Sequence, residues 1–496
     1  MLNVRRIILL GVALVSTHTV FNAQAGSFDY DKKNLLVGDT HTLSWHMPEY
    51  EKCLNVSGVD LGTSGRWSVK RNSIGRGSSS INCYKAGSHT PKKYTVMYSV
   101  FEKQSLIDSL ESKFVQSQNP SSWSGFVTSN LTRYDVEISH IGWPEPEPIF
   151  TYSFGSQYTN PIGITTVGYD YAMWVDGLIS LYQSSNSSNY AEYALDMVYQ
   201  YLRSGVHLKT ELDGSGSYLD WYSPKASRLD HWHYEWRAAY GMAQVASSLR
   251  NDPNFYSDPR LSEIKSFLIN DFEKKWRSRI NNETVTHMLS RAGLVYLYLH
   301  DLTGNSFYKS QASNLASKLN NSLRQSEKVI DGIRIQNIRC YLDKKDCASE
   351  TLLVEGSIDV SHANDTLHFI IESYKRNVVF NDSSIQLLIN TLKHSIYDKD
   401  KKYFRSNLYT VSGHPNEIYS NLGNLQGVWA KLAEYDRELL FMYLKWLDVE
   451  VAYTIDESLP APINTPLHRT KSGLLSPWTT QIMGNIALAI KDTASD

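Results

Sequence analysis

The stretch His231–Arg237 reads His-Trp-His-Tyr-Glu-Trp-Arg and stands at the head of a segment, residues 232–249, whose apolar side chains recur at helical spacing. Two imidazoles, a phenol, a carboxylate and a guanidinium therefore begin one predicted helix. Each of these groups needs a polar partner or water when it is buried. A helix that only stabilised a core would avoid so many of them, so the stretch predicts one wall of a polar cleft.

The helical pattern extends from about Tyr169 to the C-terminus, with one further helix before it. Apolar residues at i, i+3, i+4 and i+7 predict about twelve helices. They cover residues 105–116, 169–184, 190–204, 232–249, 259–276, 283–302, 305–324, 360–376, 383–396, 417–434, 437–452 and 477–491. No repeated consensus of a solenoid is visible. We therefore expect a mainly α fold, an α/α toroid of about six helical hairpins over residues 103–496, with a solenoid or a plain bundle as alternatives.

The segment before these helices, residues 26–102, has the pattern of a small all-β sandwich. Short alternating runs such as His41–Trp45 and Tyr94–Val100 are separated by turn residues. Gly38 before the Thr42–Trp45 strand, followed by Cys53 and a Ser-Gly turn, resembles the immunoglobulin-like modules of exported bacterial enzymes. The last strand departs from that pattern because Met97 stands near the position of the expected second cysteine. The resemblance implies a domain that braces its neighbour or binds glycan.

Residues 1–25 have the layout of a cleaved secretory signal. Arg5 and Arg6 precede the apolar run Ile7–Val15, and Ala23-Gln24-Ala25 has the small residues of a cleavage site. We therefore expect a secreted or periplasmic bacterial protein. Nothing later in the chain offers the ~18 to 20 apolar residues of a membrane span, so no membrane insertion is expected.

Four cysteines in an exported chain predict two disulfides. Three pairings are possible, and the spacing favours Cys53 with Cys83 and Cys340 with Cys347. A zinc site is the alternative, but the chain contains no CxxC pair. The formal net charge of −2 gives no reason to expect a nucleic acid, whereas 12 tryptophans and 32 tyrosines provide aromatic faces of the kind on which sugar rings pack.

Three further clusters carry side chains suited to chemistry. His287, Arg291 and Tyr298 follow one stripe of the predicted helix 283–302. His362 and Asn364 stand at the start of helix 360–376, where Asp359 or Ser361 can cap and the helix dipole favours an anion. The remaining candidates, suited to sugar subsites or simply to caps and turns, are Asp170, Trp174 and Asp220.

These residue types suit β-elimination from a uronate. That reaction needs a base for the C5 proton, an acid for the leaving oxygen and a group that stabilises the carboxylate. At the level of architecture and residue type, and in the Ser-His stretch Asp359–Ala363, the chain resembles the α/α-toroid polysaccharide lyases. We therefore expect a monomeric lyase that acts on an acidic polysaccharide such as alginate or glucuronan.

The resemblance also implies roles for individual residues. Tyr298 would be the acid and base, with Tyr234 as its rival and His233 or His287 as helper. Glu235, Arg291 and Asn364 would hold the carboxylate, beside His362. The expected substrate-binding residues are Arg237, His231, Asp170, Trp174 and Asp220.

Two other functions remain open. A glycoside hydrolase on the same toroid would pair Asp170 or Asp220 with Glu235, and a glycan-binding protein would have no catalytic role for any of these groups. No cofactor is expected. A structural divalent metal on His231 and His233 is less favoured, because side chains at i and i+2 diverge on a helix.

Overall fold

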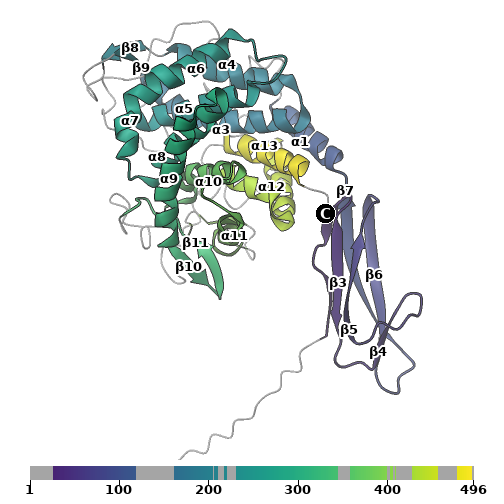
Figure 1. Ribbon diagram of the computed structural model, residues 1–496. Coiled ribbons are helices and arrows are strands. Elements are labelled where there is room, and N and C mark those ends of the chain that lie inside the picture. The colour runs from purple at the N-terminus through teal and green to yellow at the C-terminus, as the bar shows by residue number, and fades with distance from the viewer. Residues whose placement is uncertain are drawn as a thin grey trace, which may run out of the picture. The chain divides into compact units, whose positions relative to one another are not determined.

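The computed structural model describes residues 26–118, 161–204, 206–209, 217–220, 231–343, 358–398, 403–405, 408, 427–455 and 477–493. The chain divides into two compact units, Met1–Val100 and Phe101–Ser495 (Figure 1). No helix in the described part of the chain is long and apolar enough to cross a membrane. The predicted signal peptide, residues 1–25, lies outside the described residues.

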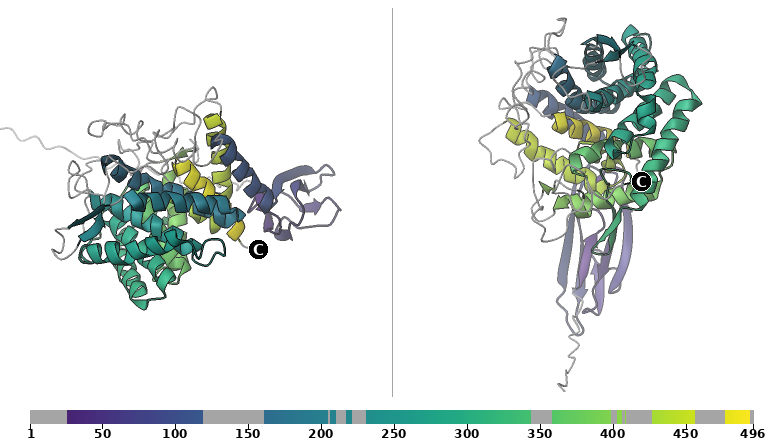
Figure 2. Two further views of the ribbon diagram at one scale, coloured as in Figure 1. Left: turned by 90° about the horizontal axis from the view of Figure 1, so that it is seen from above. Right: turned by 90° about the vertical axis from the view of Figure 1, so that its left-hand side faces the viewer.

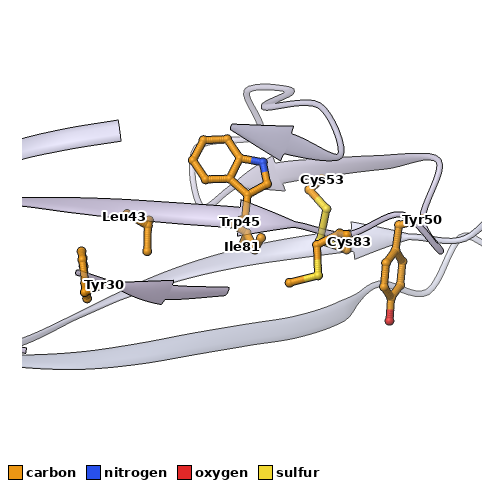
Figure 3. Packing of buried hydrophobic residues seen from close by; sticks show 8 residues of the cluster. Tyr30, Leu43, Trp45, Tyr50, Cys53, Ile81 and Cys83 are labelled. Carbon is orange, nitrogen blue, oxygen red and sulfur yellow. A yellow bond between two sulfur atoms is a disulfide. The ribbon is translucent and has the colours of Figure 1, made fainter. Parts of the chain in front are cut away.

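The first unit consists of two β-sheets packed on a shared core. Its strands are β1 Ser27–Tyr30, β2 Asn34–Leu36, β3 Thr40–His46, β4 Lys52–Asn55, β5 Ser64–Lys70, β6 Gly75–Tyr84 and β7 Lys92–Phe101. The strand orders are β1-β3-β5 and β2-β7-β6-β4. Alternate residues of β3 point inward, and Leu43 and Trp45 join Ile81 of the other sheet in the core (Figure 3). Gly65 is required opposite Trp45, because a Cβ there would lie 2.4 Å from the indole ring.

The disulfide between Cys53 and Cys83, which the sequence predicted, is present. The two cysteines lie directly opposite each other on β4 and β6, with their Cα atoms 4.0 Å apart. The bond therefore joins neighbouring strands of one sheet and lies in the core between Trp45 and Tyr50 (Figure 3). Cys340 is also disulfide-bonded. Its predicted partner, Cys347, lies outside the described residues.

The second unit is built mainly of helices, as the sequence predicts, with short β-hairpins between some of them. The helices are α1 Lys103–Gln118, α3 Pro161–Ser185, α4 Ser188–Ser204, α5 His231–Leu249, α6 Pro259–Phe267, α7 Lys274–Asn281, α8 Thr286–Thr303, α9 Ser306–Arg324, α10 Val360–Lys375, α11 Asp382–Thr391, α12 Arg437–Ile455 and α13 Pro477–Asp492. The hairpins are β8 Val206–Lys209 with β9 Ser217–Asp220, β10 Glu327–Ile330 with β11 Ile333–Gln336, and β12 Tyr397–Asp398 with β13 Tyr403–Phe404.

Three predicted helices differ in form from the expectation. A π-helical stretch, η4 Leu392–Ile396, follows α11 within the predicted helix 383–396. A π-helical stretch, η2 Leu268–Glu273, separates α6 from α7 within the predicted helix 259–276. The predicted helix 417–434 is a 3-10 helix, η6 Gly427–Glu434, over its described part. Periodicity of apolar residues does not separate these forms from an α-helix, because their turns differ from it by less than one residue.

Six of the described elements contact one another in a closed ring. α3 packs against α5, α5 against α8, α8 against α10, α10 against η6, η6 against α13, and α13 against α3 (Figure 1). Figure 2 shows the last contact from two sides, with the yellow α13 beside α3. Gly177 and Gly484 let these two helices approach closely, because a Cβ on Gly484 would lie 2.2 Å from the Gly177 carbonyl oxygen. The ring is therefore closed by helices that are about 300 residues apart.

The remaining helices alternate with the ring elements along the chain. α4 contacts α3, α6 contacts α5, α9 contacts α8, α11 contacts η6, and α12 contacts η6 and α13. The turn between α8 and α9 is short. Gly304, with φ 68°, ends α8 in the left-handed conformation, and the side chain of the next residue, Asn305, caps the start of α9. Each outer helix leads the chain back to the end of the ring at which the preceding ring element began. The ring elements therefore all begin at the same end of the ring, which we call the starting end.

Candidate active site

Two histidines face each other at the starting end of the ring. His287 is the second residue of α8 and His362 is the third of α10, and their ring centroids lie 4.9 Å apart. His287 is buried, whereas the His362 side chain keeps 31% of its surface exposed. The sequence placed these residues in separate clusters, and the packing of α8 against α10 brings them together.

Asp359 holds the His362 ring and also caps α10. Its Oδ1 accepts the backbone N–H of His362 at 3.0 Å, and its Oδ2 lies 2.5 Å from His362 Nδ1. Asp359 therefore fills the capping role that the sequence left open between it and Ser361. A carboxylate on Nδ1 favours the tautomer in which Nδ1 carries the hydrogen, so Nε2 has the basic lone pair. This is the arrangement of a histidine that accepts or donates a proton.

A buried aspartate between two arginines lies one turn deeper. Arg291 donates from Nε to Asp365 at 2.7 Å, and Arg237 donates to the other carboxylate oxygen at 3.4 Å. All three side chains are at most 1% exposed. Burial by itself raises the pKa of Asp365, but the two arginine charges hold it below its ordinary value. With Asp365 ionised, these three side chains together carry one net positive charge near the first turns of α5, α8 and α10.

Glu235 has a different environment from the one that the sequence suggested. Both of its carboxylate oxygens accept from Lys275 Nζ, at 2.9 and 2.7 Å, and Trp276 Nε1 donates to Oε1 at 2.9 Å. Glu235 is 1% exposed, and the ion pair ties α5 to α7. Its charge is already balanced by Lys275, so the described contacts give it a role in packing.

Tyr298 does not lie with the histidine pair. It follows His287 by eleven residues on α8, about 16 Å along the helix axis. Its hydroxyl lies 3.5 Å from His368 Nε2, and Arg376 lies over its ring. Burial, with the Glu372 charge, raises its pKa well above the ordinary value, so the phenol keeps its proton at neutral pH.

The other predicted site residues fall into two groups. Asn364 is buried and its Oδ1 accepts the backbone N–H of Val428, which links α10 to η6, while Trp174 is buried in α3. The remaining side chains lie outside the described residues although their backbones belong to described elements. They are His231, His233 and Tyr234 in the first turn of α5, Asp170 in α3 and Asp220 at the end of β9.

The sequence reasoning missed a buried polar network at the centre of the ring. Asp176 of α3 is fully buried and accepts from Gln244 at 2.7 Å, and Lys431 lies 2.9 Å from it. Gln481 and Asn485 of α13 also donate to it, at 2.9 and 3.1 Å. A signal was present, since amide side chains interrupt the apolar stripes of helices 232–249 and 477–491. Spacing alone could not show that they meet.

Within the described ranges, no group of three or more His, Cys, Asp or Glu side chains is placed to hold a metal ion. An oriented histidine provides proton transfer, its neighbour His287 provides a second imidazole, and the arginine cluster provides positive charge. These are three of the functions that elimination from a uronate requires.

Comparison with known proteins assigns no family. No family model matches the chain, and no curated protein is similar to it in sequence. Similar solved structures include a family 76 glycoside hydrolase from a bovine Bacteroides thetaiotaomicron strain, at 9% identity and TM-score 0.39, covering 94% of this chain and 98% of that one. A polysaccharide lyase, at 12% identity and TM-score 0.41, covers 74% and 97%. An α-1,6-mannanase of Salegentibacter, at 13% identity and TM-score 0.31, covers 61% and 97%. All three names are those of glycan-active enzymes, and they include hydrolases as well as a lyase.

Proposed function

We propose that the chain is a polysaccharide lyase that cleaves a uronate-containing polysaccharide at the starting end of the ring. The observation that carries the proposal is the pair of histidines, one of them oriented by Asp359, beside a buried cluster with net positive charge. The proposed chemistry uses only side chains of this chain and no cofactor.

In this proposal His362 Nε2 removes the proton from C5 of the uronate. The C5–H electron pair forms the C4–C5 double bond as the C4–O4 bond breaks, and the leaving oxygen takes a proton from an acid. The positive charge of the Arg237–Asp365–Arg291 cluster stabilises the carboxylate while negative charge develops on it. Asn364 lies at the same helix start as His362 and contributes to that environment.

For the acid we favour Tyr234 over Tyr298. Tyr234 belongs to the first turn of α5, the helix that brings Arg237 to Asp365. Tyr298 contacts His368 far from His362 along the ring axis. His231 and His233 share the first turn of α5 with Tyr234 and are proposed, with Asp170 and Asp220, to form the sugar subsites.

A glycoside hydrolase is the second candidate function. It needs two carboxylates on either side of the glycosidic bond. Glu235 is a poor member of such a pair because Lys275 and Trp276 occupy its oxygens. Asp359 is similarly bound to His362. These contacts favour elimination over hydrolysis.

The fold and location complete the proposal. We propose that the ring and its outer helices form an α/α toroid of six hairpins, which the alternation of inner and outer elements supports. We propose an immunoglobulin-like module for the first unit, supported by its strand orders. The disulfide between Cys53 and Cys83 fits an oxidising compartment, as expected for a monomeric enzyme exported to the periplasm or beyond.

The test is product chemistry on alginate, glucuronan and glycosaminoglycans. A lyase produces an unsaturated uronate that absorbs in the ultraviolet, whereas a hydrolase produces reducing ends without that absorbance. We expect His362→Gln to lower turnover by at least about 100-fold, the usual size of a lost proton-transfer group. The variant keeps the backbone N–H that Asp359 caps, so folding should be preserved. His300→Gln, in the last turn of α8, is the matched control and should keep full activity.

The outcomes separate the candidates. The appearance of reducing ends without ultraviolet absorbance would contradict the lyase proposal and indicate a hydrolase. Binding of these polymers with neither product would indicate a glycan-binding protein. Equal activity of His362→Gln and His300→Gln would reject the histidine site. A larger loss of turnover in Tyr298→Phe than in Tyr234→Phe would show that Tyr298, and not Tyr234, is the acid.

A further inference from the structure

A polar cavity lies at the end of the ring opposite to the histidine pair. Its volume is about 600 Å³, within the range of small-molecule sites. Side chains from the later turns of α3, α5, α8, α10 and α13 and from η6 line it. Arg250, Lys491 and Asp492 at its border are exposed, so the cavity reaches the surface. Glu372, on its wall, follows His362 by ten residues on α10, about 15 Å along the axis, so the two sites are separate.

Six of the charged side chains that line the cavity are held in ion pairs. Arg376 contacts Glu372 at 2.6 Å and Asp301 at 2.7 Å. Lys375 pairs with Glu434 at 2.6 Å, and Lys431 pairs with Asp176 behind the wall. Burial by itself raises the pKa of Glu372, but Arg376 and neighbouring cations lower it to about 2, so the pair stays ionised at neutral pH. A charged ligand would have to compete with these pairs, whereas a neutral one would leave them intact.

The floor of the cavity presents hydrogen-bonding groups. The Gln244 Nε2 group donates to Asp176, which fixes the amide. Its Oε1 is buried and accepts no hydrogen bond from the described residues. Tyr298 also lines the cavity, and Leu488 and Ala489 are among its few apolar residues.

We propose that this cavity is a binding site for a small, uncharged, polyhydroxylated molecule, the chemical class of the neutral sugars. Hydroxyl groups both donate and accept, so one such ligand meets the paired carboxylates and cations without separating them. The wall is mainly polar, which disfavours ligands that bind by burial of hydrocarbon. This site does not depend on the function proposed for the histidine pair.

The experiment measures binding of D-glucose, D-galactose, D-mannose and D-glucuronate to the exported form of the whole chain, by saturation-transfer NMR and calorimetry. We expect saturable binding of at least one neutral sugar, weaker binding of glucuronate, and a loss of about tenfold or more in Ser248→Phe. Ser248 is a half-buried wall residue on α5, and the larger ring fills the cavity. Ser248→Ala is the matched control and should bind as the parent chain does.

If Ser248→Phe does not fold, Leu488→Trp fills the cavity from α13 and is expected to have the same effect. The proposal is overturned if none of the neutral sugars binds, if glucuronate binds more tightly than they do, or if the cavity-filling variants bind unchanged. Polysaccharide cleavage by these variants is measured in parallel, and we expect it to stay unchanged because the histidine pair lies at the other end of the ring.

Discussion

The ion pair between Lys431 and Asp176 provides a quantitative test of how the ring is held together. Asp176 is fully buried at the centre of the helical unit, and Lys431 Nζ lies 2.9 Å from its Oδ1. Lys431→Met keeps most of the side-chain volume and removes the charge. The carboxylate then remains buried with amide donors but without a cation.

We expect this change to lower the free energy of unfolding by about 3–5 kcal/mol, the usual cost when one partner of a buried ion pair is removed. Three amide groups, those of Gln244, Gln481 and Asn485, still donate to Asp176 and limit the loss. In the double variant Lys431→Met with Asp176→Asn, no uncompensated charge remains. We therefore expect the double variant to be more stable than Lys431→Met alone.

The pH dependence separates a charge effect from a packing effect. Burial by itself raises the pKa of Asp176, but Lys431 and His368 lower it below its ordinary value of 3.8. A carboxylate with a lowered folded pKa contributes stability above its unfolded pKa, and that contribution is lost as pH falls. Without Lys431 the folded pKa rises, so acid protonates Asp176 more readily and relieves the penalty. The difference between parent and Lys431→Met should therefore be larger at pH 7 than near pH 4.

Urea unfolding followed by the far-ultraviolet circular dichroism of the helices measures these differences. The first unit contributes little helical signal, so the transition reports the helical unit. A loss below about 1 kcal/mol at neutral pH would mean that the pair contributes no more than an exposed one. An equal loss at both pH values would refute the charge argument and leave only the altered packing.

Three further predictions concern other parts of the molecule. Glu235→Gln should destabilise the helical unit by about 3 kcal/mol, because Lys275 loses its carboxylate; a loss of turnover without a change in melting temperature would instead support the role in carboxylate binding. The double variant Cys53→Ala with Cys83→Ala removes a disulfide that spans 30 residues, and it should lower the free energy of unfolding of the first unit by about 2–4 kcal/mol. Calorimetry would contradict this if only the unfolding transition of the helical unit shifted. Gly484→Ala should cost about 1–3 kcal/mol or more, since its Cβ would meet the Gly177 backbone; an unchanged thermal midpoint would show that α3 and α13 can separate freely.

Local signals predicted the secondary structure well. The apolar period of helix 232–249 and the capping residues Gly304 and Asn305 act within a few residues of one another, so they can be read directly from the chain. At η2 the structure has a π-helix where an α-helix was predicted. The sequence did not show this difference, because π and α turns place apolar residues on almost the same stripe. The pairing of Cys53 with Cys83 was favoured by spacing and is confirmed by their opposition on β4 and β6.

The candidate site could be predicted only in part. The sequence singled out His287, Arg291 and His362, but it also grouped Tyr298 with them. Helical spacing shows which residues lie on the same face of a helix, but it does not show how far along that face a site extends. It likewise assigned Glu235 to substrate, because its partner Lys275 lies 40 residues away on another helix. Asp365, between its two arginines, was not among the predicted site residues.

The sequence by itself determined where the strands and helices form, because hydrogen bonding, capping and apolar period act between near neighbours. Only the tertiary structure decided which helix ends meet. Arg237 reaches Asp365 across 128 residues, and Asp176 reaches Asn485 across 309. Such contacts depend on the order of packing around the ring and on the close approach at Gly177 and Gly484, and no local pattern specifies either of them.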